Sequence, residues 1–227
     1  MAIVAVAGAV LAWLNAWRAL VFVAPTSCRV TVEDPGPLTT VPGALEATHA
    51  QLLELGFESL GSHTEQHPLG PARWHLDYVH RAEGVWASVH APPKWGLSAA
   101  ARCWVPRAEA EGPRARVSLV TPGTQGVLVS SNFRRPGAHV PGAFFCGAIE
   151  GVPLARLLRA HVRRVPEVGA PQGEWTVDGL AALLRGCFNG AGKTELRQRH
   201  AAGLLWTLGA LGMVGVSLFL QPNGPIP

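Results

Sequence analysis

The chain has 227 residues, of which 48% are hydrophobic and only 15% are charged. Soluble domains carry roughly 25% charged residues on average, so this composition argues against disorder and indicates that part of the chain avoids water. Lys and Arg number 19 against 15 for Asp and Glu. An excess this small, without a basic cluster in the middle of the chain, argues against a nucleic-acid-binding protein.

An almost unbroken apolar run covers residues 2–24, in which Asn15 and Arg18 are the only strongly polar members. At about 1.5 Å per residue, a helix of this length crosses a hydrocarbon core about 30 Å thick. Arg18 lies near the end of the run, where its side chain can reach the interface. A cleaved signal peptide is the alternative, but no basic residue precedes Arg18. We therefore expect residues 1–24 to form a transmembrane helix.

The following segment, residues 26–42, is rich in Pro, Thr and Val, and we expect it to be an extended leader. A helix is predicted to begin at Pro42, because apolar residues then recur at helical spacing until Gly56, a natural C-terminal stop. Residues 62–73 are polar and contain Pro and Gly, which predicts a loop.

This predicted loop contains a candidate metal site made of His63, Glu65 and His67. Imidazole and carboxylate groups bind zinc and similar divalent ions, and in a loop these side chains could converge. His75 or His80 could supply a further ligand. The motif differs from HExxH, because Glu does not directly follow the first His. A solvated loop without a metal is the alternative interpretation, and no other cofactor is expected.

Two hairpins are predicted in the middle of the chain. Residues 74–80 and 85–91 alternate in polarity and are rich in Trp, Tyr and Val, as strands are. Residues 116–121 and 126–133 form the second pair, joined by a Pro-Gly turn sequence. Residues 144–149 are a candidate fifth strand.

His75 and Asp77 are expected on one face of the 74–80 strand, and His80 on the other. A His–Asp pair can orient an imidazole for base catalysis. However, the chain contains no G-x-S-x-G nucleophile sequence. Polar pairing on a solvated face is the alternative interpretation, so we assign no catalytic residue from the sequence.

Two more helices are predicted after the strands. Residues 153–165 place leucines and His161 on one face and arginines on much of the other. Thr176 is expected to cap a helix that runs through Leu180 and Leu184. This order of elements favours an α+β domain with an antiparallel sheet of four to five strands and covering helices.

The segment Asn189–Thr194, NGAGKT, resembles the phosphate-binding loop of ABC-type ATPases. Such a loop uses backbone N–H groups and a Lys to hold phosphates, and a strand precedes it. Here Cys187 occupies the position of the first Gly in the pattern, and the preceding residues predict a helix. We therefore interpret the segment as a glycine-rich break between two helices.

A second apolar run, residues 201–220, contains no charge, and its length also matches a bilayer. Arg197 and Arg199 precede this run, whereas the tail at 221–227 contains no Lys or Arg. The positive-inside rule therefore predicts that residues 25–200 form a cytoplasmic domain and that both termini lie outside. In that compartment the four dispersed cysteines would be reduced thiols.

Taken as a whole, the sequence predicts an integral protein of the inner or plasma membrane with one cytoplasmic domain. Small residues in both apolar runs would let these helices pack against other membrane protein subunits. We therefore expect a non-catalytic accessory or scaffold subunit of a larger membrane assembly, with lipid and membrane proteins as partners and no nucleic acid. The alternative is a membrane-tethered enzyme or ligand or metal sensor that uses the His-rich loop and the adjacent strand.

Overall fold

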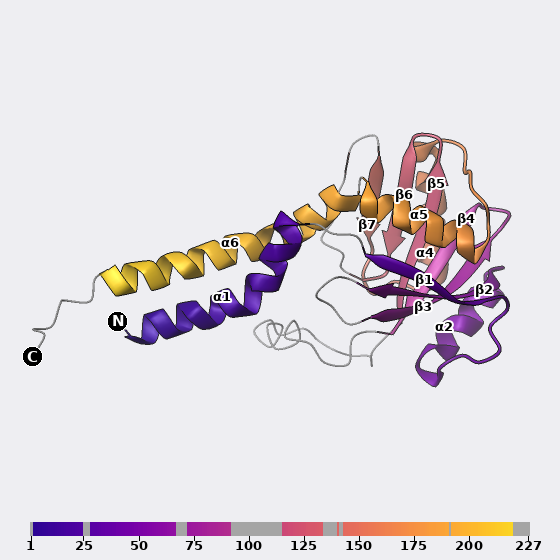
Figure 1. Cartoon of the computed structure of the whole chain (residues 1–227). Helices are drawn as coiled ribbons and strands as arrows, with labels where there is room; N and C mark the ends of the chain where they lie inside the picture. The colour runs from indigo at the N-terminus through magenta and orange to yellow at the C-terminus, as the bar shows by residue number, and fades with distance from the viewer. Residues whose placement is uncertain are drawn as a thin grey trace, which may run out of the picture. The chain divides into compact units, whose positions relative to one another are not determined.

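The structure, a computed structural model, describes residues 2–24, 28–66, 72–91, 115–133, 140, 143–190 and 192–219. The elements are α1 (Ala2–Val23), β1 (Arg29–Pro35), α2 (Gly43–Glu54), β2 (Glu58–Gln66), β3 (Arg73–His80), β4 (Val85–His90), β5 (Arg116–Gly123), β6 (Gly126–Ser131), β7 (Phe144–Ala148), α4 (Leu154–Arg164), the 3-10 helix η2 (Val165–Val168), α5 (Val177–Asn189) and α6 (Gly192–Phe219) (Figure 1). The chain divides into two compact units, one joining residues 1–25 to 196–227 and one holding residues 26–195.

The larger unit is built on one seven-stranded sheet with the strands in sequence order, β1 to β7. Neighbouring strands are antiparallel from β1 to β6, whereas β7 runs parallel to β6. The α+β class is therefore confirmed, but the predicted antiparallel sheet of four to five strands is wrong, because the sheet is larger and mixed. About a dozen residues separate β6 from β7, which is the length that a parallel connection needs.

Two strands lie where the sequence predicts a leader and a loop. β1 occupies part of the 26–42 segment, and β2 continues to Gln66, inside the predicted loop at 62–73. β2 has the sequence ESLGSHTEQ, which contains no Val, Ile or aromatic residue and so carries little strand propensity. It forms a strand because β1 and β3 pair with it on both sides. Pairing with neighbours thus outweighs the weak local preference.

Helices α2 and α4 cover one face of the sheet, and the larger apolar core lies between these layers. Leu52 of α2 and Leu157 of α4 belong to the same buried cluster as Leu76, Tyr78 and Leu119 of the sheet. Both helices occur where the sequence predicts them, from Pro42 and over residues 153–165. Their apolar stripes face the sheet, as amphipathic surface helices require.

Helix α5 covers part of the opposite face. A second buried cluster there contains Leu180 together with Val79, Trp86, Val120 and Val129. Thr176 caps the helix as predicted, since its Oγ1 accepts a hydrogen bond from the Gly179 N–H at 3.0 Å. Arg185 of α5 donates from Nε to the Val30 carbonyl at 3.0 Å, which fixes the edge strand β1 to this helix.

The glycine-rich segment that resembles a phosphate-binding loop lies between two helices, as expected. Helix α5 ends at Asn189 and α6 begins at Gly192. No strand precedes the segment, because the residues before it belong to α5. The backbone therefore differs from the strand–loop–helix arrangement of a phosphate-binding loop.

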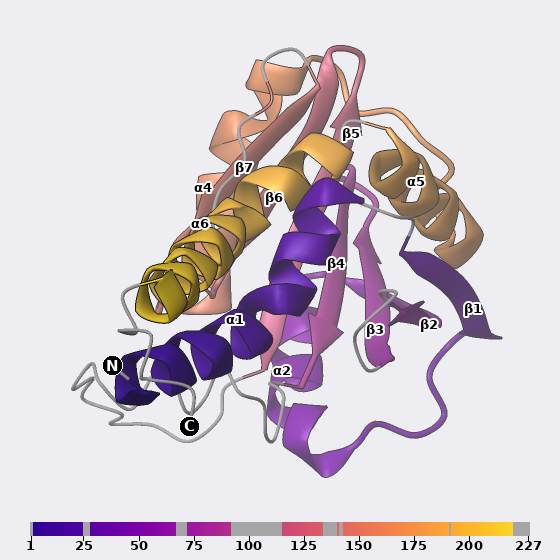
Figure 2. The same cartoon turned by 60° about the vertical axis from the view of Figure 1, so that its left-hand side comes forward.

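The smaller unit consists of α1 and the C-terminal part of α6, which lie side by side (Figures 1 and 2). The two helices approach closely at Gly8, where an added β-carbon would be only 2.9 Å from the Ala210 carbonyl oxygen. Ile3–Val23 and His200–Phe219 are long and apolar enough to cross a membrane, judged by length and composition. Large apolar side chains on both helices are exposed, among them Trp13 at 81% and Leu205 at 69%.

Candidate metal centre

The sheet face that α5 partly covers changes from apolar to polar along the strands. On β3, Val79 belongs to the α5 cluster, and strand alternation puts Asp77 and His75 on the same face. On β4, Trp86 is followed on that face by Ser88 and His90. These polar side chains are buried rather than solvated, with Asp77 fully buried and His75 only 5% exposed.

Strand register aligns three histidines into what we call the imidazole row: His63 of β2, His75 of β3 and His90 of β4. His63 lies directly opposite His75 in the antiparallel ladder. The rings of these two residues are stacked, with centroids 4.7 Å apart. The His90 ring lies 4.6 Å from the His75 ring on its other side. The row therefore crosses three adjacent strands.

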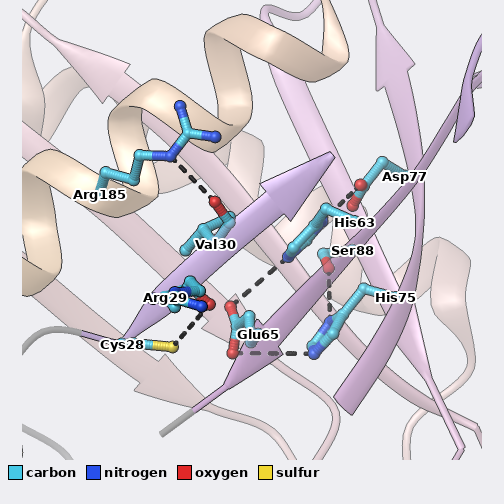
Figure 3. A network of polar contacts seen from close by, with 9 residues as sticks. All are labelled: Cys28, Arg29, Val30, His63, Glu65, His75, Asp77, Ser88 and Arg185. Atoms are coloured by element: carbon cyan, nitrogen blue, oxygen red, sulfur yellow. Dashed lines mark hydrogen bonds and ion pairs between the residues drawn. The ribbon is translucent and has the colours of Figure 1, made fainter. Parts of the chain in front are cut away.

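Glu65 completes a group of metal-type ligands with two of these rings (Figure 3). Its carboxylate oxygens lie 3.6 Å from His63 Nε2 and 3.7 Å from His75 Nε2. One ligand atom from each of the three residues lies within 4.8 Å of the other two. In a tetrahedral zinc site with bonds of about 2.1 Å, neighbouring ligand atoms are about 3.4 Å apart. The two distances from Glu65 are close to this value.

Asp77 orients the first ring. His63 Nδ1 donates to Asp77 Oδ2 over 2.5 Å, and both side chains are fully buried. The other ring nitrogen, Nε2, is therefore aimed toward Glu65, and it has no hydrogen-bond partner among the residues that the structure describes. Histidines that bind metals usually donate their second ring N–H to a carboxylate or carbonyl, which fixes the ring orientation. The His63–Asp77 pair has this arrangement.

Ser88 orients the second ring. Its Oγ lies 2.9 Å from His75 Nδ1. When Nδ1 carries the proton and donates to this oxygen, the lone pair of a neutral His75 lies on Nε2, on the side of Glu65. Each imidazole thus has its own buried partner, Asp77 for His63 and Ser88 for His75.

The His63–Asp77 pair carries charge in the absence of a metal. Burial alone would lower the pKa of His63, but the negative charge and hydrogen bond of Asp77 outweigh it and raise that pKa to about 10. Burial also raises the pKa of Asp77, and its interactions with His63 oppose this rise. We therefore assign an imidazolium with a proton on Nε2 that faces Glu65. Metal ligation needs the neutral ring, so a bound ion would take the place of this proton.

His90 lies beside the ligand group without joining it. Burial, followed by the charge of His75, lowers the pKa of His90 to about 3, so its ring is neutral. The ring meets Phe133 edge-on, with centroids 5.7 Å apart. His90 and Phe133 thus place two uncharged rings beside the site, with the Arg116 guanidinium 5.2 Å from the centroid of the Phe133 ring.

The structure places the predicted ligands in different settings. His63 and Glu65 lie together on strand β2, whereas His67 lies outside the described residues. Of the two further ligands considered from the sequence, His75 joins the group. His80 projects from the opposite face of β3, where its ring meets Phe57 at 5.3 Å. The prediction of a loop is wrong for His63 and Glu65, because both lie in strand β2. Their spacing of two residues in this strand brings their side chains to one face.

Sequence reasoning missed the contributions of Ser88 and His90. Both lie in a strand that the sequence predicts, and their spacing of two residues placed them on one face. The same spacing relates His63 to Glu65 in β2. Polar residues two apart in three neighbouring strands could have indicated a polar site on one face of the sheet. That inference required β2 to be recognised as a strand.

The types of ligand atom in the group limit which metal ions the site can bind. Two imidazole nitrogens and one carboxylate oxygen bind zinc, and the same set binds iron(II) in sites with open positions. A metal bound here would act as a Lewis acid toward a further ligand. Three protein ligands are the number found in zinc sites that keep one coordination position open.

Comparison of the chain with protein-family models, with curated proteins and with solved structures found no match. No relative therefore assigns an activity to this fold. The function has to be argued from the chemistry and geometry of the site itself.

Proposed function

We propose that this chain is a membrane-tethered metal-binding protein whose domain holds one divalent ion of the zinc type at His63, Glu65 and His75. The convergence of these three ligand atoms carries the proposal. Two features support it further: both imidazoles are buried, and hydrogen bonds from their Nδ1 atoms to Asp77 and Ser88 orient them.

The free-energy cost of burying this group favours the same conclusion. A buried polar atom without a hydrogen-bond partner costs about 1–3 kcal/mol. His63 Nε2 is such an atom among the described residues, and the Glu65 carboxylate lies 3.6 Å from it. A divalent ion would coordinate the nitrogen and neutralise the carboxylate at once. An ion-pair network without a metal is the competing explanation, in which a protonated His63 stabilises both Asp77 and Glu65.

Metal content separates these two explanations. The full chain, extracted in mild detergent and exposed to zinc, is expected to retain about one equivalent after desalting. Glu65→Gln keeps the shape of the side chain but removes its charge, and should weaken zinc binding at least 100-fold. Glu58→Gln is the matched control on the same strand, because Glu58 is exposed and pairs with Arg81. It should bind zinc like the parent.

Removal of the metal gives a second readout. When free metal is at 100 times its dissociation constant, binding stabilises the folded state by about 2.7 kcal/mol. A chelator should therefore lower the unfolding temperature of the parent and of Glu58→Gln, but not that of Glu65→Gln. A parent that retains no zinc, or a Glu65→Gln variant that retains it as tightly, would overturn the proposal.

We infer that α1 and α6 cross the membrane and that residues 25–200 face the cytoplasm. The lengths and exposed apolar side chains of these helices support the crossing. Lys193 and Arg197 are exposed just before the second apolar stretch, which supports the orientation. A reporter that works only outside the cytoplasm should be active after Pro227 and inactive within residues 106–113. The reverse pattern would exclude this topology.

An accessory role in a membrane assembly is a second candidate function, favoured by one feature of α6. Gly209, Gly212 and Gly215 recur every three residues, and a β-carbon added at any of them would meet no atom within 4 Å. Small residues let a second transmembrane helix approach closely. Gentle detergent extraction should then recover a membrane protein partner that Gly212→Leu releases. A parent that runs alone as a monomer would count against this role.

A further inference from the structure

We infer that the metal site takes a small oxyanion, a carboxylate or phosphate group, as an additional ligand, with Arg73 at its rim. The inference rests on the proposed metal site at His63, Glu65 and His75. It adds the chemical class of the ligand and a residue outside the metal-binding group. Coordination, charge and access each support it.

Coordination leaves room for another ligand. The three metal-type ligands come from β2 and β3, and all project from the same face of the sheet. An ion bound to them would lie above that face, with its protein ligands on the sheet side. Among the described residues, no fourth His, Cys, Asp or Glu joins the group. Zinc normally completes four-coordination, and an open position takes water or an exogenous ligand.

The charge around the position favours an anion. The two positive charges of the ion would be balanced by the carboxylates of Glu65 and Asp77. Arg73 lies directly opposite Glu65 in the ladder. Directly opposite residues share a face, so the Arg73 guanidinium belongs to the face that carries the site. Its charge adds to a metal centre that the two carboxylates have already neutralised, and a positive charge beside the open position attracts anions.

The burial of the metal-type ligands favours a small additional ligand, which would reach the metal near Arg73. His63 is fully buried and the His75 side chain is 7% exposed, whereas 15% of the Glu65 side chain is exposed. Arg73 is exposed, and it forms no ion pair with the part of the chain that the structure describes. The site is therefore most open at the side where Glu65 and Arg73 face each other. A guanidinium there can bind both oxygens of a carboxylate or phosphate while a third contact is made to the metal.

The test uses the full chain in detergent, loaded with cobalt(II), whose visible absorption reports the ligands at a zinc-type site. Sodium acetate and sodium phosphate are titrated separately at constant ionic strength, with perchlorate as the reference salt. We expect a saturable change of the spectrum with at least one of the two anions. Comparison of the acetate and phosphate curves then identifies the preferred group.

Arg73→Gln should weaken binding of that anion about tenfold while leaving cobalt affinity within twofold of the parent. Arg81→Gln is the matched control, because Arg81 is exposed, follows the other end of β3 and pairs with Glu58. It should leave both affinities unchanged. Both arginines are exposed, so neither substitution is expected to impair folding.

The outcomes separate this inference from the proposed function. If the parent binds no cobalt, the metal site itself is overturned. If cobalt binds but neither anion changes the spectrum, the metal site stands and the oxyanion ligand is excluded. If Arg73→Gln binds the anion as tightly as the parent, the assignment of Arg73 to the rim is overturned.

Discussion

The protein buries histidine on both faces of its sheet, and the two environments use the ring nitrogens differently. Toward α4, His161 is fully buried, with Thr121 Oγ1 3.0 Å from its Nε2 and Ser130 Oγ 2.9 Å from its Nδ1. On the other face His63 is equally buried, but Nε2 has no hydrogen-bond partner among the described residues. Burial therefore marks neither residue as functional. His63 differs from His161 because its Nε2, which has no such partner in the described part of the chain, points toward the carboxylate of Glu65.

The charge states of the two rings differ in the same way. Burial, followed by the charge of Arg164, lowers the pKa of His161 to about 3. The ring is neutral and serves as a polar part of the core, with both nitrogens satisfied by hydroxyl groups. His63 has a pKa raised to about 10, because the attraction of Asp77 outweighs burial. One histidine thus completes the packing of a helix, and the other holds a proton where a metal would bind.

The largest effect is expected from breaking the pair that supports the candidate site. His63→Leu leaves Asp77 fully buried without its partner, and removing one member of a buried ion pair costs about 3–5 kcal/mol. The free energy of unfolding should fall by that amount, measured by thermal unfolding of the full chain in detergent.

The double variant His63→Leu with Asp77→Leu serves as the control for this prediction. It removes both charges, so it should recover much of the lost stability while still binding no zinc. If His63→Leu were as stable as the parent, the buried ion pair would not be a structural support of the site.

The second prediction concerns pH and addresses the α4 side of the comparison. His161 is neutral in the folded chain, whereas an unfolded histidine takes up a proton below about pH 6.5. Between about pH 6.5 and 3 the unfolded state therefore binds more protons, and stability falls as pH falls. The slope is at most about 1.4 kcal/mol per pH unit for one group.

His161→Gln removes this titration and is the variant to compare. The other groups that face the ring are the hydroxyls of Thr121 and Ser130, which do not titrate in this range, and Arg164, which stays charged. The difference in stability between parent and variant should therefore shrink as pH falls from 7 to 5. Parallel pH profiles would show that folding does not lower the pKa of His161.

The comparison also shows what the sequence can reveal about this fold. His161 is predicted on the apolar face of its helix from spacing alone, and the structure buries it there. Its partners Thr121 and Ser130 lie on two neighbouring strands, in β5 and β6. Only the packing of α4 on the sheet brings those hydroxyls to the ring, so the local sequence pattern does not predict these contacts.

The candidate site was partly predictable for a similar reason. His63, Glu65 and His75 carry metal-ligating groups that composition reveals, and their identities suggest the chemistry. Their mutual position depends on the pairing of β2 with β3, which the polar sequence of β2 does not indicate. Asp77 and Ser88 act through hydrogen bonds across strands, and this arrangement emerges only once the register is known.

The smallest expected effects come from a matched pair of serine substitutions, one beside each imidazole. Ser130 supports His161 and Ser88 supports His75, each with Oγ 2.9 Å from Nδ1. Ser130→Ala leaves a buried ring nitrogen without a partner and should lower the free energy of unfolding by about 1–3 kcal/mol. Because its effect is confined to the α4 side, zinc affinity should stay within twofold of the parent.

Ser88→Ala should show the opposite pattern. It removes the hydroxyl that orients His75 toward Glu65, and loss of such an outer hydrogen bond lowers metal affinity about 10- to 100-fold. Zinc competition with a chromophoric chelator measures this affinity, and thermal unfolding in excess chelator measures metal-free stability. Since Ser88→Ala also leaves a ring nitrogen without its partner, some loss of stability is expected in both variants, but only Ser88→Ala should weaken zinc binding. If both serine variants bound zinc equally well, the hydrogen bond to His75 would have no part in positioning a ligand, and the two histidine environments would differ in location rather than in function.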